Sequence, residues 1–396
     1  MIPDIRRGYN TAFTDDAYKA FVDDIGNAYN HIPNFRIAET PVFIPRALKE
    51  HLFRATAEIS DTICRPDFKE LTQNALQRKY AVPNEGDHTL FLVMDFGVTL
   101  KENGELWPML IEVQGFPSLY FYQHLAAKAY RKHFRIPDQM NHLCDGLNEE
   151  SYLELLRKVI VGDEDPKQVV LLEVEPWKQN TQIDFHATKH HLGIHVACIT
   201  EVYQRDGKAY YKDEQGKEIH IKRIYNRVIY DELIQRKELT KQFKFTRECD
   251  VHWVGHPNWF FRISKFTLPF IESQYAPRTW FLSQMNELPP DLDHFVLKPL
   301  YSFSGTGVKL HIAKHDLDLV TDPAQYILQE RVKYHPVIET LDEPAKVELR
   351  MLMIWEEGAP RPRIVNNLAR LSKGEMIGVK YNKDKTWVGG SVGFFE

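Results

Sequence analysis

The spacing of apolar residues predicts helices in two parts of the chain. In DDAYKAFVDDIGNAY and PRALKEHLFRATAEISDTI, both within the first 85 residues, apolar side chains recur every three or four positions. This is the period of an amphipathic helix. We therefore predict that residues 1 to 85 are mostly helical, and residues 118 to 160 return to the same spacing.

Alternating apolar and polar residues predict two β-hairpins. The first runs from TLFLVMDFGVTL, residues 89 to 100, through the turn KENGE to LWPMLIEVQGF. A glycine-containing loop between two alternating runs is typical of a hairpin. The second is predicted within FVLKPLYSFSGTGVKLH, residues 295 to 311, where Phe295, Val296 and Leu297 form one strand. Val308, Leu310 and Ile312 alternate as its partner.

The middle of the chain has the pattern of a parallel sheet. GDEDPKQ, beginning at residue 162, combines glycine, proline and charge and predicts a boundary. It is followed by the buried-strand pattern VVLLEVEP, the helix DFHATKHHLG closed by Gly193, and the strand IHVACITEV. This order predicts a β-α-β unit in a small open-sheet domain. We divide the chain into three units, residues 1–162, 163–258 and 259–396.

Composition narrows the choice of partners. The chain has 396 residues, 43% hydrophobic and 27% charged, which indicates a globular protein of more than one domain. Its net charge of −5 offers no basic stripe for a nucleic-acid backbone, so we expect small-molecule partners and no nucleic acid. Four scattered cysteines without a CxxC pair predict reduced thiols. No apolar run approaches eighteen residues, so we expect no membrane span and a cytoplasmic protein.

The tip of the second hairpin suits an anion. Lys298 ends an apolar run, and Ser302, Ser304, Gly305, Thr306 and Gly307 follow with exposed backbone N–H groups and hydroxyls. Such a loop fits a triphosphate. The alternative is an ordinary Gly/Ser turn, because the loop matches neither the GxxxxGK[ST] nor the GxGxxG fingerprint.

The first hairpin carries oxygen ligands. Asp95 lies late in one strand, and Glu112 and Gln114, two residues apart on the return strand, share a face. Two carboxylates and an amide oxygen would suit Mg²⁺, which binds hard oxygen ligands beside nucleotide phosphates. The alternative is the polar face of a half-solvated sheet.

These motifs together resemble those of the ATP-grasp enzymes, in which ATP lies between two α+β subdomains. Lys265 in RISKFTLPFIESQYAPRT and Lys298 before its small-residue loop resemble the two nucleotide lysines of that family. YILQERV, residues 326 to 332, resembles its adenine hinge. The first hairpin resembles its metal hairpin, although Gln114 stands where the family usually has asparagine.

The order of the motifs resembles one branch of the family. Here the metal hairpin precedes both lysines, as in the circularly permuted ATP-grasp branch related to glutathionylspermidine synthetases, and RIYNRVIYDEL resembles a stretch of that branch. The resemblance implies an α/β (α+β) protein with a circularly permuted ATP-grasp fold and a small open-sheet α/β pre-ATP-grasp domain. Residues 1–162 would hold a helical segment and the metal-binding half. Residues 163–258 would form the substrate-side domain, and residues 259–396 the lysine and glycine-loop half.

The resemblance implies an ATP- and Mg²⁺-dependent carboxylate–amine ligase that works through an acylphosphate. Its substrates would be a small carboxylate and an amine such as an amino acid, peptide or polyamine. Lys298 and Glu112 are expected to be partly exposed in a cleft. The residues assigned by the resemblance are Lys265 and Lys298 for the α- and β-phosphates, Ser304, Gly305, Thr306 and Gly307 for the β- and γ-phosphates, Gln329, Glu330 and Val332 for adenine and ribose, Asp95, Glu112 and Gln114 for Mg²⁺, and Arg350 and Arg370 for the transferred phosphoryl group.

Several alternatives stay open at this point. Arg350 shares a strand face with Glu348, so it fits a salt bridge as well as a catalytic site. Asn226 and Arg227 could face the substrate from the end of a strand in the central domain. The whole chain fits, besides a ligase, a catalytically silent nucleotide-binding or scaffold protein on the same fold, or a kinase that stops at phosphoryl transfer.

Overall fold

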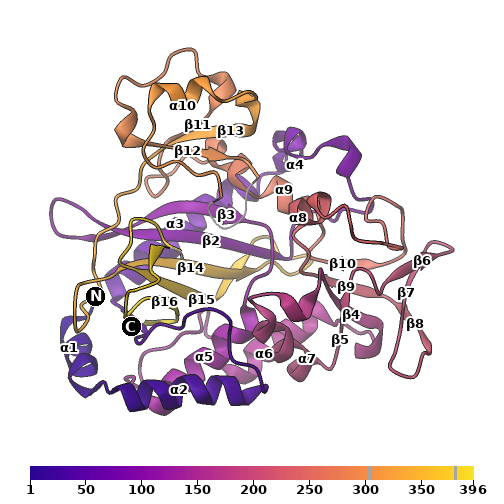
Figure 1. Ribbon diagram of the computed structural model, residues 1–396, viewed down its shortest axis with the longest axis horizontal. Coiled ribbons are helices and arrows are strands. Elements are labelled where there is room, and N and C mark those ends of the chain that lie inside the picture. The colour runs from indigo at the N-terminus through magenta and orange to yellow at the C-terminus, as the bar shows by residue number, and fades with distance from the viewer. Residues whose placement is uncertain (302–305, 379–380) are drawn as a thin grey trace.

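The largest sheet joins strands from both ends of the chain. The computed structural model describes residues 1–301, 306–378 and 381–396, and Figure 1 shows it as a mixed α/β protein with several sheets, which confirms the predicted class. The five-stranded sheet has the order β16-β15-β14-β2-β3, and all its neighbouring strands are antiparallel. Its strands are β2 (Phe91–Leu100), β3 (Leu106–Gln114), β14 (Lys346–Ile354), β15 (Arg363–Ser372) and β16 (Gly389–Ser391).

The predicted first hairpin is confirmed as β2 and β3. Gly104 takes a positive φ of 83° in the turn between them, which glycine adopts without strain. Side chains alternate along β2, so Leu92, Met94 and Phe96 enter the main apolar cluster while Asp95 and Gly97 lie on the opposite face. The alternation of side chains along β2 therefore determines which of its residues can contribute to a polar site.

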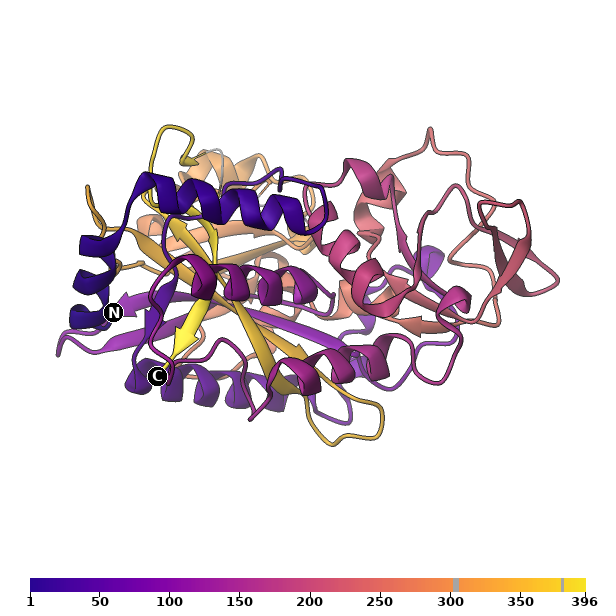
Figure 2. The same cartoon turned by 90° about the horizontal axis from the view of Figure 1, so that it is seen from below.

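Helices cover the faces of the large sheet. The helical predictions for residues 1 to 85 and 118 to 160 are confirmed, apart from strand β1 (Val42–Ile44), which pairs in parallel with β17 (Gly393–Phe395). Thr14 caps its helix by accepting from the backbone N of Ala17 at 3.2 Å. Figure 2 shows α2 and α5 side by side. These helices are α1 (Pro3–Ala12), α2 (Asp15–Ala28), α3 (Arg46–Ile63), α4 (Phe68–Leu71), α5 (Tyr120–His133) and α6 (Glu149–Ile160).

The central segment contains a four-stranded parallel sheet. The predicted β-α-β unit is confirmed, because β4 and β5 pair in parallel across helix α7 (Gln182–Leu192), which ends at Gly193 with φ 70°. The sheet order is β10-β9-β4-β5, and a small antiparallel meander β6-β7-β8 projects beside it (Figure 1). Its strands are β4 (Val169–Glu173), β5 (His195–Cys198), β9 (Arg223–Asn226) and β10 (His252–Val254); those of the meander are β6 (Tyr203–Arg205), β7 (Lys208–Lys212) and β8 (Glu218–Ile221).

A third sheet contains the second predicted lysine. It has the order β11-β13-β12 and consists of β11 (Thr279–Phe281), β13 (Tyr326–Glu330) and β12 (Phe295–Pro299). The predicted second hairpin is wrong in its return strand. Residues 308–312 make only one isolated bridge to β12, from Lys309 to Leu297, and the full partner of β12 is β13. The alternation of that segment reflects partial burial, since Ile312 packs on Leu297 and Leu328, and not membership of a ladder.

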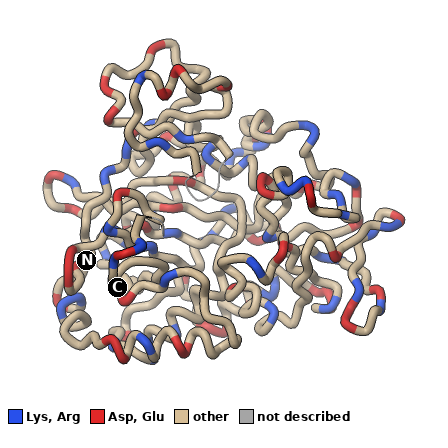
Figure 3. The backbone as a smooth tube through the Cα atoms, viewed as in Figure 1, with Lys and Arg blue, Asp and Glu red and all other residues tan. Residues whose placement is uncertain are grey.

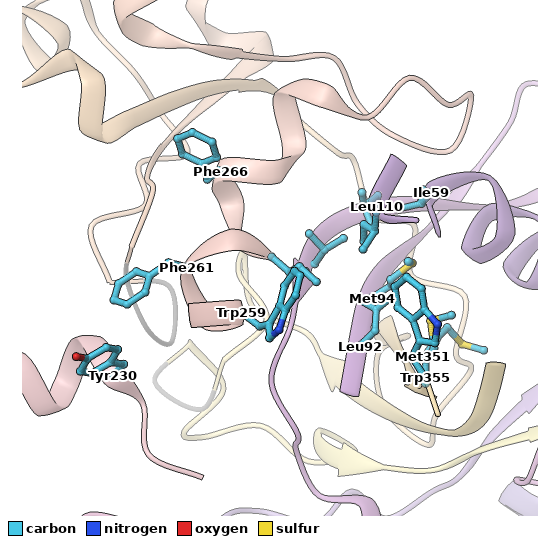
Figure 4. Packing of buried hydrophobic residues seen from close by; sticks show 14 of the residues in the cluster. Ile59, Leu92, Met94, Leu110, Tyr230, Trp259, Phe261, Phe266, Met351 and Trp355 are labelled. Atoms are coloured by element: carbon cyan, nitrogen blue, oxygen red, sulfur yellow. The ribbon is translucent and has the colours of Figure 1, made fainter. Parts of the chain in front are cut away.

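One apolar core connects the large sheet with the shorter helices α8 (Tyr230–Gln235) and α9 (Asn258–Arg262). Figure 4 shows that this core extends from the strands of the large sheet toward Trp259 and Phe261 of α9 and Tyr230 of α8. The short helix α10 (Lys314–Asp318) lies beyond the three-stranded sheet (Figure 1). The core therefore holds sheets from distant parts of the chain against one another.

Charges of both signs are intermixed along the backbone (Figure 3). Among the described residues, no helix has the length and apolar character needed to cross a membrane.

Candidate functional site

Charged residues from four strands share one face of the five-stranded sheet. Asp95 on β2 lies directly opposite Glu112 on β3 and opposite Arg350 on β14. Glu348, two residues before Arg350, lies opposite Arg370 on β15. Residues directly opposite in neighbouring antiparallel strands present their side chains to the same face. The register alone therefore gathers three carboxylates and two guanidinium groups.

Asp95 is held by both arginines. The Nε and Nη2 atoms of Arg350 donate to its two carboxylate oxygens at 2.6 Å each, and Nη2 of Arg370 donates at 2.7 Å. Asp95 is only 1% exposed. Burial would raise its pKa, but Arg350 and Arg370 outweigh that effect and hold the pKa below its usual value. Asp95 is therefore an ionised, fully engaged carboxylate.

Glu348 is the second carboxylate on this face that accepts hydrogen bonds from two side chains. It accepts hydrogen bonds from Arg370 and from the hydroxyl of Tyr334, the latter at 2.5 Å. Burial raises the pKa of Glu348, and the neighbouring Asp95 adds to that rise while Arg370 opposes it. The ring of Tyr334 lies on Gly97, where a Cβ atom would come within 2.8 Å of it. Gly97 thus provides the space that Tyr334 occupies.

Lys298 reaches this region from the three-stranded sheet. Its Nζ donates to the carbonyl oxygen of Ile111 on β3 at 3.2 Å and to Oε1 of Gln329 at 2.6 Å. The expectation that Lys298 is partly exposed is wrong, since its exposed fraction is 8%. Burial lowers its pKa to about 8, Lys265 contributes in the same direction, and Glu112 opposes the change. Lys298 therefore lies close enough to both Glu112 and Lys265 for their charges to act on its pKa.

The other residues predicted to bind the nucleotide differ in their burial and in the side of the strand to which they point. Gln329 is buried and also donates to the hydroxyl of Thr279 at 2.9 Å. Glu330, next along β13, points to the other side of the strand, where it pairs with Arg278. Val332 follows directly after β13.

The predicted loop is described only in part. Thr306 and Gly307 are exposed, and Gly307 has a positive φ of 74°. Ser302, Ser304 and Gly305 lie outside the described residues.

The predicted metal ligands fit a cation unequally. Glu112 is partly exposed, as expected, at 25% of its side chain, and it accepts a hydrogen bond from the amide nitrogen of Gln114 at 2.5 Å. One carboxylate and one amide oxygen suit Mg²⁺, which often takes few protein ligands and completes its shell with phosphates and water. Asp95 does not fit while two guanidinium groups fill its oxygens. Within the described parts of the chain, no group of three or more His, Cys, Asp or Glu side chains could hold a metal ion.

The arginines differ in access. About a third of the Arg370 side chain is exposed, 35%, against 10% for Arg350. The salt-bridge alternative for Arg350 is correct in kind, but its partner is Asp95 across the sheet, while Glu348 pairs with Arg370.

The sequence did not reveal the roles of Tyr334 and Gly97. The spacing of Glu348 and Arg350 in VELRM was the signal for a charged sheet face, since period two places them together.

The prediction for Arg227 is wrong. Its side chain is 3% exposed and donates to Asp184 at 2.6 Å. Asp184 also accepts from the backbone N of Phe121 and of Tyr122 in the first turn of α5. The pair therefore joins the end of β9 to two helices inside the protein, and Asn226 is buried beside it.

Comparison with known proteins shows similarity only at the level of structure. No protein-family description matches the chain, and no curated protein matches it. The chain is similar to a glutathione synthetase-like effector from Globodera pallida in its apo form, with a TM-score of 0.58 and 9% identity over 100% of this chain and 97% of that one. It is also similar to a putative gamma-glutamylcysteine synthetase from Methylobacillus flagellatus KT, with a TM-score of 0.39 and 12% identity over 85% of each chain. The first similarity shows a shared fold, and the second is too distant to support an argument.

Proposed function

We propose that the protein is an ATP-dependent carboxylate–amine ligase on a circularly permuted ATP-grasp fold. The observation that carries this proposal is the contact of Lys298 with strand β3, which brings a lysine beside Glu112 and the charged sheet face. A nucleotide triphosphate needs cations for its phosphates and carboxylates for the accompanying metal, and the two groups meet here. The whole-chain fold similarity to a protein described as glutathione synthetase-like supports the same reaction class.

The proposed reaction has two steps. A carboxylate oxygen of the first substrate attacks the γ-phosphorus of ATP, the bond to the β-phosphate oxygen breaks, and ADP leaves. The amine nitrogen of the second substrate then attacks the acyl carbon and loses a proton. The bond between that carbon and the oxygen shared with the phosphoryl group breaks, and inorganic phosphate leaves with that oxygen. Such chemistry depends mainly on positioning and on stabilising charge.

Each group of residues has a defined task in this proposal. Lys265 and Lys298 hold the α- and β-phosphates, and Thr306 and Gly307 lie at the end of the loop proposed for the β- and γ-phosphates. Arg370 is the arginine with the greater access to a transferred phosphoryl group. Mg²⁺, when bound at Glu112 and Gln114, would neutralise phosphate oxygens.

Asp95 and Glu348 are positioning residues in the proposal. They hold the guanidinium groups of Arg350 and Arg370 in fixed planes, so that little reorganisation is needed when charge develops on the phosphoryl group. The units 1–162, 163–258 and 259–396 belong to the same proposal. The first and third supply the strands of the large sheet, and the parallel sheet comes from the second.

A second candidate is a catalytically silent nucleotide-binding or scaffold protein on the same fold. The engagement of Asp95 by two arginines favours it, because an aspartate so held is removed from metal binding. A kinase would share the nucleotide site and differ only in lacking an amine acceptor.

The test is calorimetric binding of a non-hydrolysable ATP analogue to the full chain, with Mg²⁺ and with a chelator. Lys298→Ala and Glu112→Gln should weaken binding at least tenfold. Lys309→Ala, which removes a lysine of the same region that pairs with Asp316, is the matched control and should leave binding unchanged. Absence of nucleotide binding in the wild type would refute the proposal. If the analogue binds, the next measurement uses ATP itself. Amine-dependent release of ADP then separates a ligase from a silent protein, and mass analysis of the product separates a ligase from a kinase.

A further inference from the structure

A cavity of about 340 Å³ lies where the ends of β12 and β13 meet helices α8 and α9. Its walls come from residues 75–80, from α8 and α9, and from the ends of β12 and β13. Pro299, which lines it, directly follows Lys298 in β12, so the two side chains lie on opposite faces of that strand. The volume is at the lower end of the range for small-molecule sites, and neither the nucleotide nor the metal assignment uses it.

Aromatic rings form a fixed wall of this cavity. Phe261 and Tyr301 meet edge to face with centroids 5.3 Å apart. The hydroxyl of Tyr301 donates to the backbone oxygen of Ala75 at 2.6 Å, which holds its ring in place. Tyr80 also lines the cavity, and its ring contacts Tyr230 of α8. Such faces favour hydrocarbon groups and also attract organic cations.

Asp231 is the acidic residue in the lining. Its carboxylate is partly buried and accepts one hydrogen bond, from Gln235 at 3.2 Å. Among the residues that the structure describes, Asp231 forms no salt bridge within 4 Å. Burial raises its pKa, and the hydrogen bond from Gln235 and the charge of Lys265 oppose that rise. The cavity therefore offers a carboxylate that no described residue engages in a salt bridge, although the charge of Lys265 acts on it.

Among the lining residues that the structure describes, Lys79 is the basic one, and it forms no salt bridge with Asp231. Lys79 is exposed, and its Nζ lies 4.7 Å from the centre of the Tyr80 ring. Because Asp231 is partly buried while Lys79 is exposed, the cavity favours a positive over a negative ligand group.

We propose that this cavity binds the amine substrate, with the ammonium group at Asp231 and its hydrocarbon part between the rings of Tyr80, Phe261 and Tyr301. This inference rests on the proposed ligase function and names the place and the chemistry of the second substrate. The position is suitable, because Asp231 interacts electrostatically with Lys265, and Lys265 with Lys298. An amine held there would lie near Lys265, one of the two lysines assigned to the phosphates, and it would lose a proton as it attacks the acyl carbon.

The test is the binding of 2-phenylethylamine and 1,5-diaminopentane to the full chain without nucleotide, measured by calorimetry. The neutral controls are 2-phenylethanol and 1,5-pentanediol. Amines should bind at least tenfold more tightly than the matched alcohols, and Asp231→Asn should remove that preference. Glu232→Gln, which alters the next acid of α8, should keep it, because Glu232 lies outside the cavity lining and faces Arg236. Ile234→Trp, which fills the cavity, should abolish amine binding.

Equal binding of amines and alcohols, or full amine affinity in Asp231→Asn, would overturn the inference. Thermal unfolding of each variant shows whether it is folded, and Asp231 is exposed enough that we expect an unchanged midpoint. Nucleotide binding, measured on the same samples, separates the two proposals. Amine binding that depends on Asp231 without any nucleotide binding supports the cavity and refutes the ligase. Nucleotide binding without amine binding supports the proposed nucleotide site and overturns the cavity proposal.

Discussion

The Arg350 guanidinium donates two parallel hydrogen bonds to the Asp95 carboxylate, each 2.6 Å long, between strands β14 and β2. The two residues are 255 positions apart in the chain, and both are almost fully buried. A planar guanidinium matched to a carboxylate in this way is rigid and directional. The pair fixes the centre of the charged sheet face, and it determines which acids of that face remain available to a ligand.

Breaking this pair on one side should destabilise the fold. Arg350→Met leaves the Asp95 carboxylate buried with Arg370 as its remaining guanidinium partner, which we expect to lower the free energy of unfolding by about 3 kcal/mol. The double variant Asp95→Leu/Arg350→Met should recover much of that loss, since it leaves no unpaired charge between the two positions. Urea denaturation measures both. The exposed pair of Arg7 and Asp4 is the control, and Arg7→Ala should change stability by less than about 0.5 kcal/mol. If the double variant loses as much stability as Asp95→Leu and Arg350→Met lose in sum, that result would contradict the expected coupling.

Asp95 and Glu112 should respond differently to substitution. Glu112→Gln should leave the urea midpoint near that of the wild type, because a quarter of its side chain is exposed, while it weakens Mg²⁺-dependent binding of the ATP analogue at least tenfold. Asp95→Asn should lower the urea midpoint, because it removes the ionic partner of two arginines. Calorimetric Mg²⁺ titrations and denaturation of the same two variants give the comparison. Loss of Mg²⁺ dependence in Asp95→Asn with an unchanged midpoint would show that Asp95 is a metal ligand after all.

Nucleotide binding should weaken as the pH rises through about 8. Burial gives Lys298 a pKa of about 8 in place of 10.5, so its positive charge is lost within an accessible pH range. Analogue affinity, measured from pH 6.5 to 9.5, should fall at the upper end. Lys298→Arg keeps its charge throughout and should give a flatter profile. An identical decline in both proteins would assign the effect to another group.

The same lysine predicts an opposite trend in stability. The folded state releases the Lys298 proton at lower pH than the unfolded chain does, so between about pH 8 and 10.5 the unfolded state binds more protons. The contribution of Lys298 to the free energy of unfolding therefore becomes more favourable as the pH rises through that range. It is unfavourable and constant below pH 8. Urea denaturation of the wild type minus that of Lys298→Met, from pH 7 to 10, isolates it. A flat difference would mean that Lys298 is not buried in solution.

Gly97 should tolerate no side chain. A Cβ atom there would lie 2.8 Å from the Tyr334 ring, so Gly97→Ala should displace the ring and its hydrogen bond to Glu348. We expect a loss of about 1–3 kcal/mol in the free energy of unfolding. The pair Gly97→Ala/Tyr334→Leu should lose less than the two single changes together, because the clash is gone. Gly8→Ala is the control, since nothing lies within 4 Å of a Cβ at that helical position. A Gly97→Ala protein of wild-type stability would show that Tyr334 can move freely.

Elements that depend only on residues close together in the chain could be predicted from the sequence. The β2–β3 hairpin, the β4-α7-β5 unit and the helices of the first block follow from period, turn residues and caps that act within a few residues of one another. The same local rules placed Glu348 and Arg350 on one face. They did not place Asp95 opposite Glu112. The register set by the turn would pair Asp95 with Ile111, and an irregularity between Asp95 and Phe96 shifts the pairing to Glu112.

Only the tertiary structure decided which charges meet. Residues 308–312 alternate like a strand, yet β13 pairs with β12 along its full length and leaves them a single bridge. Arg350 and Arg370 reach Asp95 because β2 and β14 pair across more than two hundred residues, and no local pattern specifies such a pairing. Asp95 thereby changes from an expected metal ligand into the partner of two guanidinium groups. The sequence by itself determined the elements and the polar residues they carry, because these depend on short-range spacing. The tertiary structure determined the partners, because long-range strand pairing and burial decide which charges must neutralise one another.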